Sequence, residues 1–182
     1  MRRALLSAAV ALAVVLAAAA TVSAGSGAVS DPSGDLYDVP TTGGSGQVDI
    51  VRATFGHSGG RLVHTVTTSG DIPDPAAGAT SPMLFIEHPT TANGTAECTY
   101  FVGRHAGKLG VFTCGYGDRV GSARIRRTSA RTVRFEFSPR AIGNPASYEW
   151  AFLTRVRTRY NASTWVDRLP DGDHGYLTHQ LR

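Results

Sequence analysis

Short runs of alternating apolar and polar residues, separated by turn-forming residues, constrain the fold of this chain more than any other feature. The clearest runs, residues 48–57 and 61–69, flank Ser58-Gly59-Gly60. A Gly-Gly pair between two such runs predicts a tight β-hairpin. With this turn, the predicted register places Phe55 opposite His64, Ala53 opposite Val66 and His57 opposite Leu62. The predicted core face of the hairpin consists of Val51, Ala53, Phe55, Leu62 and Val66.

The same pattern continues along the chain and predicts eight or nine strands with almost no helix. One short helix is expected after Ser138-Pro139, since Ser caps a helix, Pro suits its first position and Gly143 ends it. This element content predicts a single all-β domain over residues 31–182, an antiparallel, jelly-roll-like β-sandwich. The further strands are expected at residues 82–88, 97–103, 110–116, 122–127, 132–138, 147–158 and 175–181.

Residues 1–24 have the pattern of a secretory signal peptide. Arg2 and Arg3 precede an apolar run, residues 4–20, and the small residues 22–24 form a cleavage site. The alternative is an uncleaved membrane anchor. We expect cleavage after Ala24, a flexible leader over residues 25–30, and a secreted mature chain without a membrane span.

The charge balance does not favour a nucleic-acid partner. The chain has 18 Lys and Arg residues against 14 Asp and Glu, with a net charge of +4. Arginines alternate with apolar residues, as in Arg124-Ile125-Arg126, which predicts that they lie on the solvent-exposed face of strands. We therefore expect no nucleic-acid binding. We also expect the protein to be a monomer.

The two cysteines predict a disulfide bond between Cys98 and Cys114, because export makes pairing the default. If residues 104–108 turn the chain so that Arg104 faces Lys108, Cys98 faces Cys114 across a hairpin. A catalytic or metal-binding thiol is the alternative, but no C-x-x-C motif is present.

Sequence motifs for catalysis are absent. The chain contains no G-x-S-x-G elbow in a strand–helix context, no H-E-x-x-H and no P-loop. This favours a non-catalytic binding module. A purely structural secreted domain and a hydrolase of unrecognised type are the alternatives.

The six histidines are dispersed. His64 falls on the apolar face of the first hairpin, where a hydrogen-bonded core histidine is the expected role. Because His57 shares that face, a two-histidine metal site is the alternative, or a haem site with Met83 as a second axial ligand.

Aspartates near both ends of the chain suggest a structural calcium ion. Calcium takes six to eight oxygen ligands, and Asp-rich turns supply them. The alternative is that Asp, Pro and Gly simply form good turns. The candidate ligands are Asp31, Asp35, Asp49, Asp167 and Asp171, with Asp173 nearby.

Exposed aromatic side chains would indicate sugar binding, because their faces stack on sugar rings. Trp150 alternates in phase with Tyr148 and Phe152, which predicts a core position. Trp165 lies in a polar stretch and is the main candidate for a ligand-binding platform, with Tyr37 and Tyr176 as weaker candidates.

Two segments carry a family resemblance. D-P-S-G-D, V-D-I-V-R-A-T-F and L-V-H-T-V-T-T-S-G-D-I-P near the N-terminus, with W-V-D-R-L-P-D-G near the C-terminus, resemble family 9 carbohydrate-binding modules and the related DOMON domains. The resemblance implies a β-sandwich, often a structural calcium, and sugar or haem ligands in some members. It matches Asp31, Asp35 and Asp49 to the calcium role, and implies a polysaccharide or cell-envelope ligand.

Overall fold

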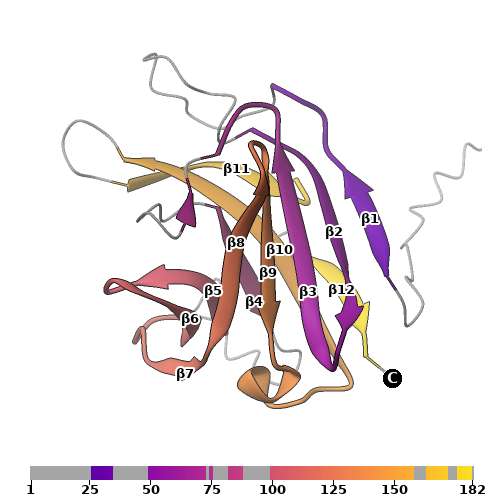
Figure 1. Ribbon diagram of the computed structural model, residues 1–182, viewed down its shortest axis with the longest axis vertical. Coiled ribbons are helices and arrows are strands. Elements are labelled where there is room, and N and C mark those ends of the chain that lie inside the picture. The colour runs from indigo at the N-terminus through magenta and orange to yellow at the C-terminus, as the bar shows by residue number, and fades with distance from the viewer. Residues whose placement is uncertain are drawn as a thin grey trace, which may run out of the picture.

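The computed structural model describes residues 26–34, 49–72, 74–75, 82–87, 99–157, 163–171 and 176–181. Most of this part of the chain is β-structure (Figure 1). Its elements are β1 (Gly27–Ser30), β2 (Ile50–Ser58), β3 (Arg61–Thr68), β4 (Met83–Glu87), β5 (Tyr100–His105), β6 (Lys108–Thr113), β7 (Arg119–Gly121), β8 (Ala123–Ser129), β9 (Thr132–Phe137), the 3-10 helix η3 (Pro139–Ile142), β10 (Ser147–Arg157), β11 (Ser163–Leu169) and β12 (Leu177–Gln180).

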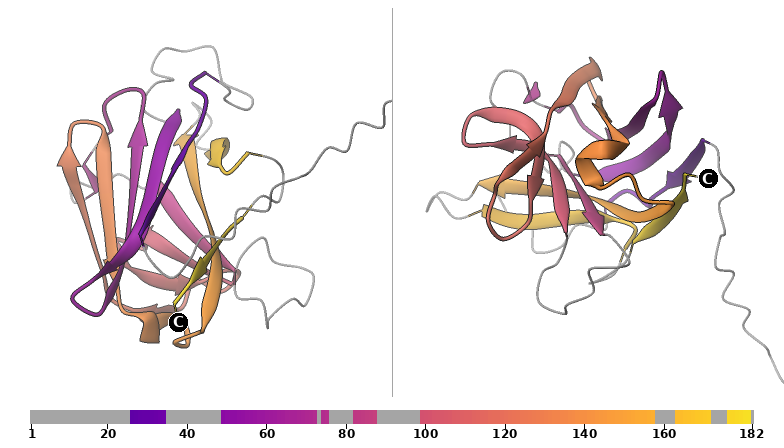
Figure 2. Two further views of the ribbon diagram at one scale, coloured as in Figure 1. Left: turned by 90° about the vertical axis from the view of Figure 1, so that its right-hand side faces the viewer. Right: turned by 90° about the horizontal axis from the view of Figure 1, so that it is seen from below.

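The strands form two antiparallel sheets. The five-stranded sheet has the order β1-β2-β3-β9-β8, and the seven-stranded sheet has the order β11-β10-β4-β5-β6-β7, with β12 also paired to β10. The two sheets lie face to face as the layers of a sandwich (Figures 1 and 2). The predicted all-β sandwich is therefore confirmed, with more strands than expected.

The main core fills the space between the two sheets. Strand alternation sends every second side chain inward, and Tyr148, Trp150 and Phe152 of β10 follow this rule as predicted. They meet inward residues of the opposite sheet. The largest fully buried side chains are Trp150, Tyr148, Phe135, Phe137, Phe152, Ile50, Leu62, Ile72, Leu84, Ile86, Ile142 and Leu169.

A second apolar cluster lies on the other face of the seven-stranded sheet. Its members alternate with core residues along β4, β5, β6 and β10, so these strands carry apolar side chains on both faces. The cluster consists of Met83, Phe85, Phe101, Phe112, Ala151 and Leu153, with Cys114 and Tyr176 packed against it.

The first hairpin has the predicted register. Phe55 pairs with His64, and the loop glycines Gly59 and Gly60 have φ values of 56° and 71°. The predicted core position of Val51 is wrong: a register shift between Ile50 and Arg52 leaves Val51 only half-buried, and Ile50 is fully buried in its place.

The register predicted for the second hairpin is wrong by one residue. Ala106 and Gly107 form a two-residue turn with φ values of 47° and 78°, so His105 pairs with Lys108. One consequence is that the Cys114 amide donates to the Thr99 carbonyl at 3.0 Å. Cys98 lies outside the described residues.

The N-terminal residues contribute to the sheet, which corrects the expectation of a flexible leader over residues 25–30. Gly27–Ser30 forms β1, which pairs with β2 and places Gly27 beside Phe55. A Cβ atom on Gly27 would lie 2.3 Å from Cζ of Phe55, so only glycine allows the strand to approach this closely.

Three strands were not predicted: β1, β7 and β11. The short helix was, and it occurs as η3. The Ser138 hydroxyl accepts a hydrogen bond from the Arg140 amide at 3.3 Å, and Gly143 ends the helix at φ 79°. No helix within the described residues is long and apolar enough to cross a membrane.

Candidate functional site

Three aspartates from distant parts of the chain converge on one point. Asp31 follows β1, Asp167 lies in β11, and Asp171 follows β11. One carboxylate oxygen from each lies within 4.8 Å of the other two. Like charges this close repel each other, and a hard cation bound by oxygen ligands relieves that repulsion. Among the described residues, no other group of three His, Cys, Asp or Glu side chains meets at this spacing.

Asp167 is held rigidly within this cluster. Its side chain is buried, and one carboxylate oxygen accepts a hydrogen bond from the Ile50 amide at the start of β2. The other accepts from the Arg168 amide at 2.7 Å. Asp167 therefore connects the two sheets, and each carboxylate oxygen keeps lone-pair capacity for a further partner.

Asp49 serves the adjacent turn instead of joining the cluster. Its Oδ1 accepts from the Gly34 amide at 3.0 Å, and its Oδ2 accepts from the Ser69 hydroxyl at 2.7 Å. The buried carboxylate thus fixes the Asp31-Pro32-Ser33-Gly34 turn that presents Asp31.

The predicted calcium ligands therefore fall into three groups. The structure brings Asp31, Asp167 and Asp171 together, and it gives Asp49 a supporting role. Asp35, like Asp173, lies outside the described residues.

A buried row of polar side chains crosses the core. His64 Nε2 lies 2.6 Å from the Tyr148 hydroxyl, and that hydroxyl lies 2.9 Å from His179 Nδ1. The phenol has one proton, so it donates to one imidazole and accepts from the other. His64 is the hydrogen-bonded core histidine that the sequence predicts.

Burial keeps His64 and Tyr148 uncharged. Burial holds the pKa of His64 well below its usual value, and repulsion from His179 and His57 lowers it further. Burial also raises the pKa of Tyr148. A fully buried, hydrogen-bonded row suits packing and register more than chemistry on a substrate.

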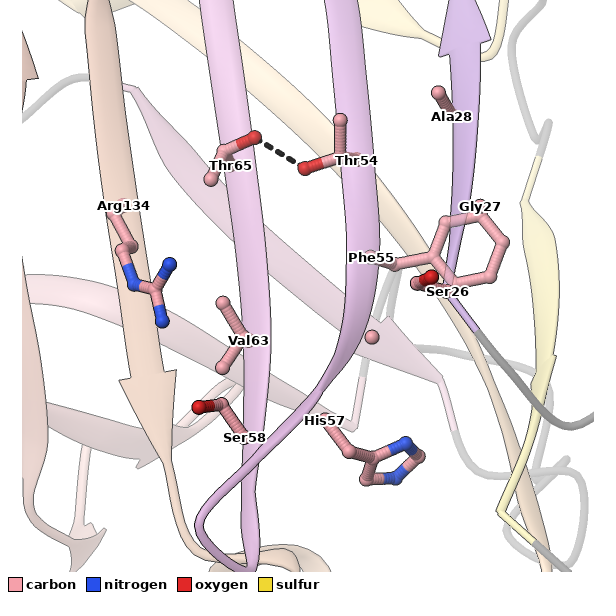
Figure 3. Close-up of a pocket in the computed structure, with 11 residues that line it drawn as sticks. Ser26, Gly27, Ala28, Thr54, Phe55, His57, Ser58, Val63, Thr65 and Arg134 are labelled. Atoms are coloured by element: carbon pink, nitrogen blue, oxygen red, sulfur yellow. Dashed lines mark hydrogen bonds between the residues drawn. The ribbon is translucent and has the colours of Figure 1, made fainter.

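A groove crosses the outer face of the five-stranded sheet. Figure 3 shows it running from Ala28 on β1, over Thr54 and Thr65, to Arg134 on β9. Its volume is about 530 Å³, within the range of small-ligand sites. The Thr54 and Thr65 hydroxyls are hydrogen-bonded to each other. Thus the groove offers hydroxyl groups along its length and a guanidinium at one edge.

Two other predicted sites are only partly described. The backbone of Trp165 lies in β11 opposite Arg155, but its side chain is outside the described part of the chain. Cys114 is half-buried and is not a free thiol. Because Cys98 is not described, the disulfide stays a prediction.

The chain matches no protein-family model and no curated protein. The site is therefore assigned from its own geometry.

No sequence motif marks the groove. Arg124-Ile125-Arg126 predicted exposed arginines, and the structure confirms that Arg124 and Arg126 are exposed. The missing information was the strand order: β8 pairs with β9, and β9 pairs with β3. This order gathers arginines from separate segments onto one surface.

Proposed function

We propose that this protein is a secreted, non-catalytic β-sandwich module that binds carbohydrate or a cell-surface ligand and contains a structural calcium ion. The convergence of Asp31, Asp167 and Asp171 carries the calcium part. The family resemblance and the open groove on the five-stranded sheet support the binding part.

The three aspartates fit calcium by ligand type and by position. Carboxylate oxygens are its preferred ligands, and turns allow the flexible geometry that it accepts. An ion here would link β1, at the edge of one sheet, to β11, at the edge of the other. Its role would be to hold the two edges together.

The non-catalytic part rests on how the described polar groups are used. His64 and His179 are buried and bonded to Tyr148, so neither is presented to a substrate. Asp167 and Asp49 accept hydrogen bonds from backbone or hydroxyl donors. These contacts are typical of a structural framework.

Calcium should raise the melting temperature of the purified protein. A ligand at one hundred times its Kd stabilises the folded state by about 2.7 kcal/mol. For a domain of this size that corresponds to roughly 5–10 °C. Thermal unfolding with calcium, with magnesium and with EDTA measures the effect. Equal melting temperatures in all three would contradict the calcium part.

The variant Asp171→Asn tests the position of the ion. Asp171 is exposed, so the substitution removes a ligand without disturbing the core. We expect it to abolish the calcium-dependent shift. Asp118→Asn, an exposed aspartate beyond β6, is the matched control and should keep the full shift. Loss of the shift in both variants would argue against this site.

A further inference from the structure

The outer face of the five-stranded sheet has a strong excess of positive charge. Its outward positions alternate with core residues on β2, β3, β8 and β9. The only carboxylate among these described positions is Glu136. We call this surface the arginine face, defined by Arg52, Arg61, Arg124, Arg126 and Arg134 together with Glu136.

Glu136 compensates only part of this charge. It accepts a hydrogen bond from Arg134 Nε at 2.7 Å and one from Arg126 Nη2 at 3.3 Å. Arg61 donates instead to the Glu136 carbonyl oxygen at 3.0 Å. Within the described residues, no salt bridge joins Arg52, Arg61 or Arg124 to a carboxylate.

The strand register places like charges next to each other. Arg126 and Arg134 are direct partners across β8 and β9, an arrangement that is unfavourable unless an anion lies between them. Glu136 sits beside both, but its side chain is only 13 % exposed. The guanidinium groups therefore have donors left for an anion arriving from solvent.

The groove lies next to these arginines. Arg134 forms one edge, and Ala28, whose side chain is small, lines the opposite side (Figure 3). Thr54 and Thr65 lie between them as directly paired residues. A ligand in the groove would meet hydroxyl groups first and a guanidinium at the end.

We propose that the arginine face binds an acidic polysaccharide, with its carboxylates on Arg134 and Arg126 and a sugar ring in the groove over Thr54 and Thr65. Guanidinium groups match carboxylates through two parallel hydrogen bonds. Hydroxyl groups in the groove suit the hydroxyls of a sugar. This proposal specifies the ligand class of the proposed carbohydrate-binding function, and it does not depend on calcium.

The shape of the face favours a polysaccharide over a nucleic acid. Single-stranded nucleic acid is held by stacking on exposed aromatic side chains. None of the outward positions of the arginine face is aromatic in the part of the chain that the structure describes. Duplex DNA is read by an element that enters its major groove, and this face is the surface of a sheet.

The test compares two soluble cellulose derivatives that share a backbone. Carboxymethyl cellulose carries carboxylates, and hydroxyethyl cellulose is neutral. In calorimetry with the mature chain, we expect binding of the first, at least tenfold weaker binding of the second, and weaker binding at higher salt. Single-stranded and duplex DNA are measured under the same conditions.

Substitutions locate the site. Arg126→Gln combined with Arg134→Gln should weaken binding of carboxymethyl cellulose at least tenfold. Arg119→Gln combined with Arg140→Gln removes two exposed arginines elsewhere, on β7 and η3, and should change binding less than twofold. Melting temperatures of both double variants check that each is folded. If the first does not fold, Arg124→Gln, which removes an exposed charge from the same face, takes its place.

The possible binding results separate the acidic preference from carbohydrate binding in general. Equal binding of both celluloses would overturn the acidic preference and leave the proposed carbohydrate function standing. No binding of either would overturn the acidic-polysaccharide proposal and count against the carbohydrate part of the proposed function, whereas the calcium part is decided by thermal unfolding. Tighter binding of DNA than of carboxymethyl cellulose would assign the face to nucleic acid and also overturn the proposal.

Discussion

The outer faces of the two sheets are opposite in character. On the five-stranded sheet, outward positions carry mainly arginine and threonine with one glutamate, and most of these side chains are half-buried or exposed. On the seven-stranded sheet, outward positions carry the second apolar cluster, including Phe85, Phe101 and Phe112, which are each no more than 9 % exposed. One sheet therefore has a single buried face, and the other has two.

We infer from this difference that the seven-stranded sheet mainly supplies stability and that the outer face of the five-stranded sheet is available for binding. Burying a large aromatic side chain contributes roughly 2–3 kcal/mol, whereas an exposed ion pair contributes well under 1 kcal/mol. The seven-stranded sheet thus supplies stability on both sides. The outer face of the five-stranded sheet contributes little to folding and tolerates residues suited to a ligand.

The largest expected effect comes from Phe112→Ala. Phe112 is 2 % exposed and stacks on Phe101 with ring centroids 5.1 Å apart, so truncation leaves a cavity. We expect a loss of about 3–5 kcal/mol in the free energy of unfolding, measured by denaturant titration.

The matched change on the other outer face is Arg126→Ala, which should cost less than about 1 kcal/mol. Equal costs for the two variants would show that the outer faces do not differ in the way described.

The next largest loss of stability is expected at Tyr148, whose hydroxyl is buried between the two sheets. Tyr148→Phe removes the hydroxyl between His64 and His179 and leaves two imidazole nitrogens without that partner. We expect a loss of about 1–3 kcal/mol. Thr65→Val, which removes a partly exposed hydroxyl from the groove, should cost less. A smaller loss for Tyr148→Phe than for Thr65→Val would contradict the structural role of the buried row.

The two faces also differ in how far the sequence could predict them. Apart from the register shift beside Val51, apolar and polar residues alternate along the first hairpin of the five-stranded sheet, so its register was correctly predicted, as were the exposed Arg124 and Arg126. In the second hairpin, residues 100–105 and 108–113 are apolar on both faces, so alternation could not fix the register, and the turn geometry at Ala106 decided it.

The candidate calcium site was predicted only in part, because some of its contacts join residues that are distant in the sequence. Asp-rich turns identified Asp31, Asp167 and Asp171, but the sequence could not show that Asp49 would bond to Gly34 and Ser69. Strand β1 was missed because its pairing depends on a close approach of Gly27 to Phe55, a contact distant in sequence. Long-range contacts of this kind have no local signal.

Mild acid should destabilise the protein through His64. Its pKa is lowered by folding, so the unfolded state takes up a proton that the folded state does not. Stability is therefore present above the usual histidine pKa of 6.5 and is lost as the pH falls below it. One proton corresponds to about 1.4 kcal/mol per pH unit. Denaturant titrations from pH 7.5 to 5.5 measure the slope.

His64→Phe removes the group that takes up this proton on unfolding, so the free energy of unfolding should depend less on pH. The variant also loses the hydrogen bond to Tyr148. The slope, not the absolute stability, is the relevant readout. An unchanged slope in this variant would assign the acid sensitivity to other groups.

The smallest effect is expected on the arginine face, from Glu136→Gln. The hydrogen bond from Arg134 and the nearby charges of Arg134, Arg126 and Arg124 lower the pKa of Glu136 below its usual value of 4.5. The folded state thus favours the carboxylate, so its contribution is present above pH 4.5 and is lost at lower pH. Because the arginines that pair with Glu136 lie at the surface, and a Gln side chain can still accept a hydrogen bond, the variant should cost less than about 1 kcal/mol at pH 7. The same variant should bind carboxymethyl cellulose more tightly, because Arg126 and Arg134 lose their competing carboxylate. Weaker binding would indicate that Glu136 orients these arginines for the ligand.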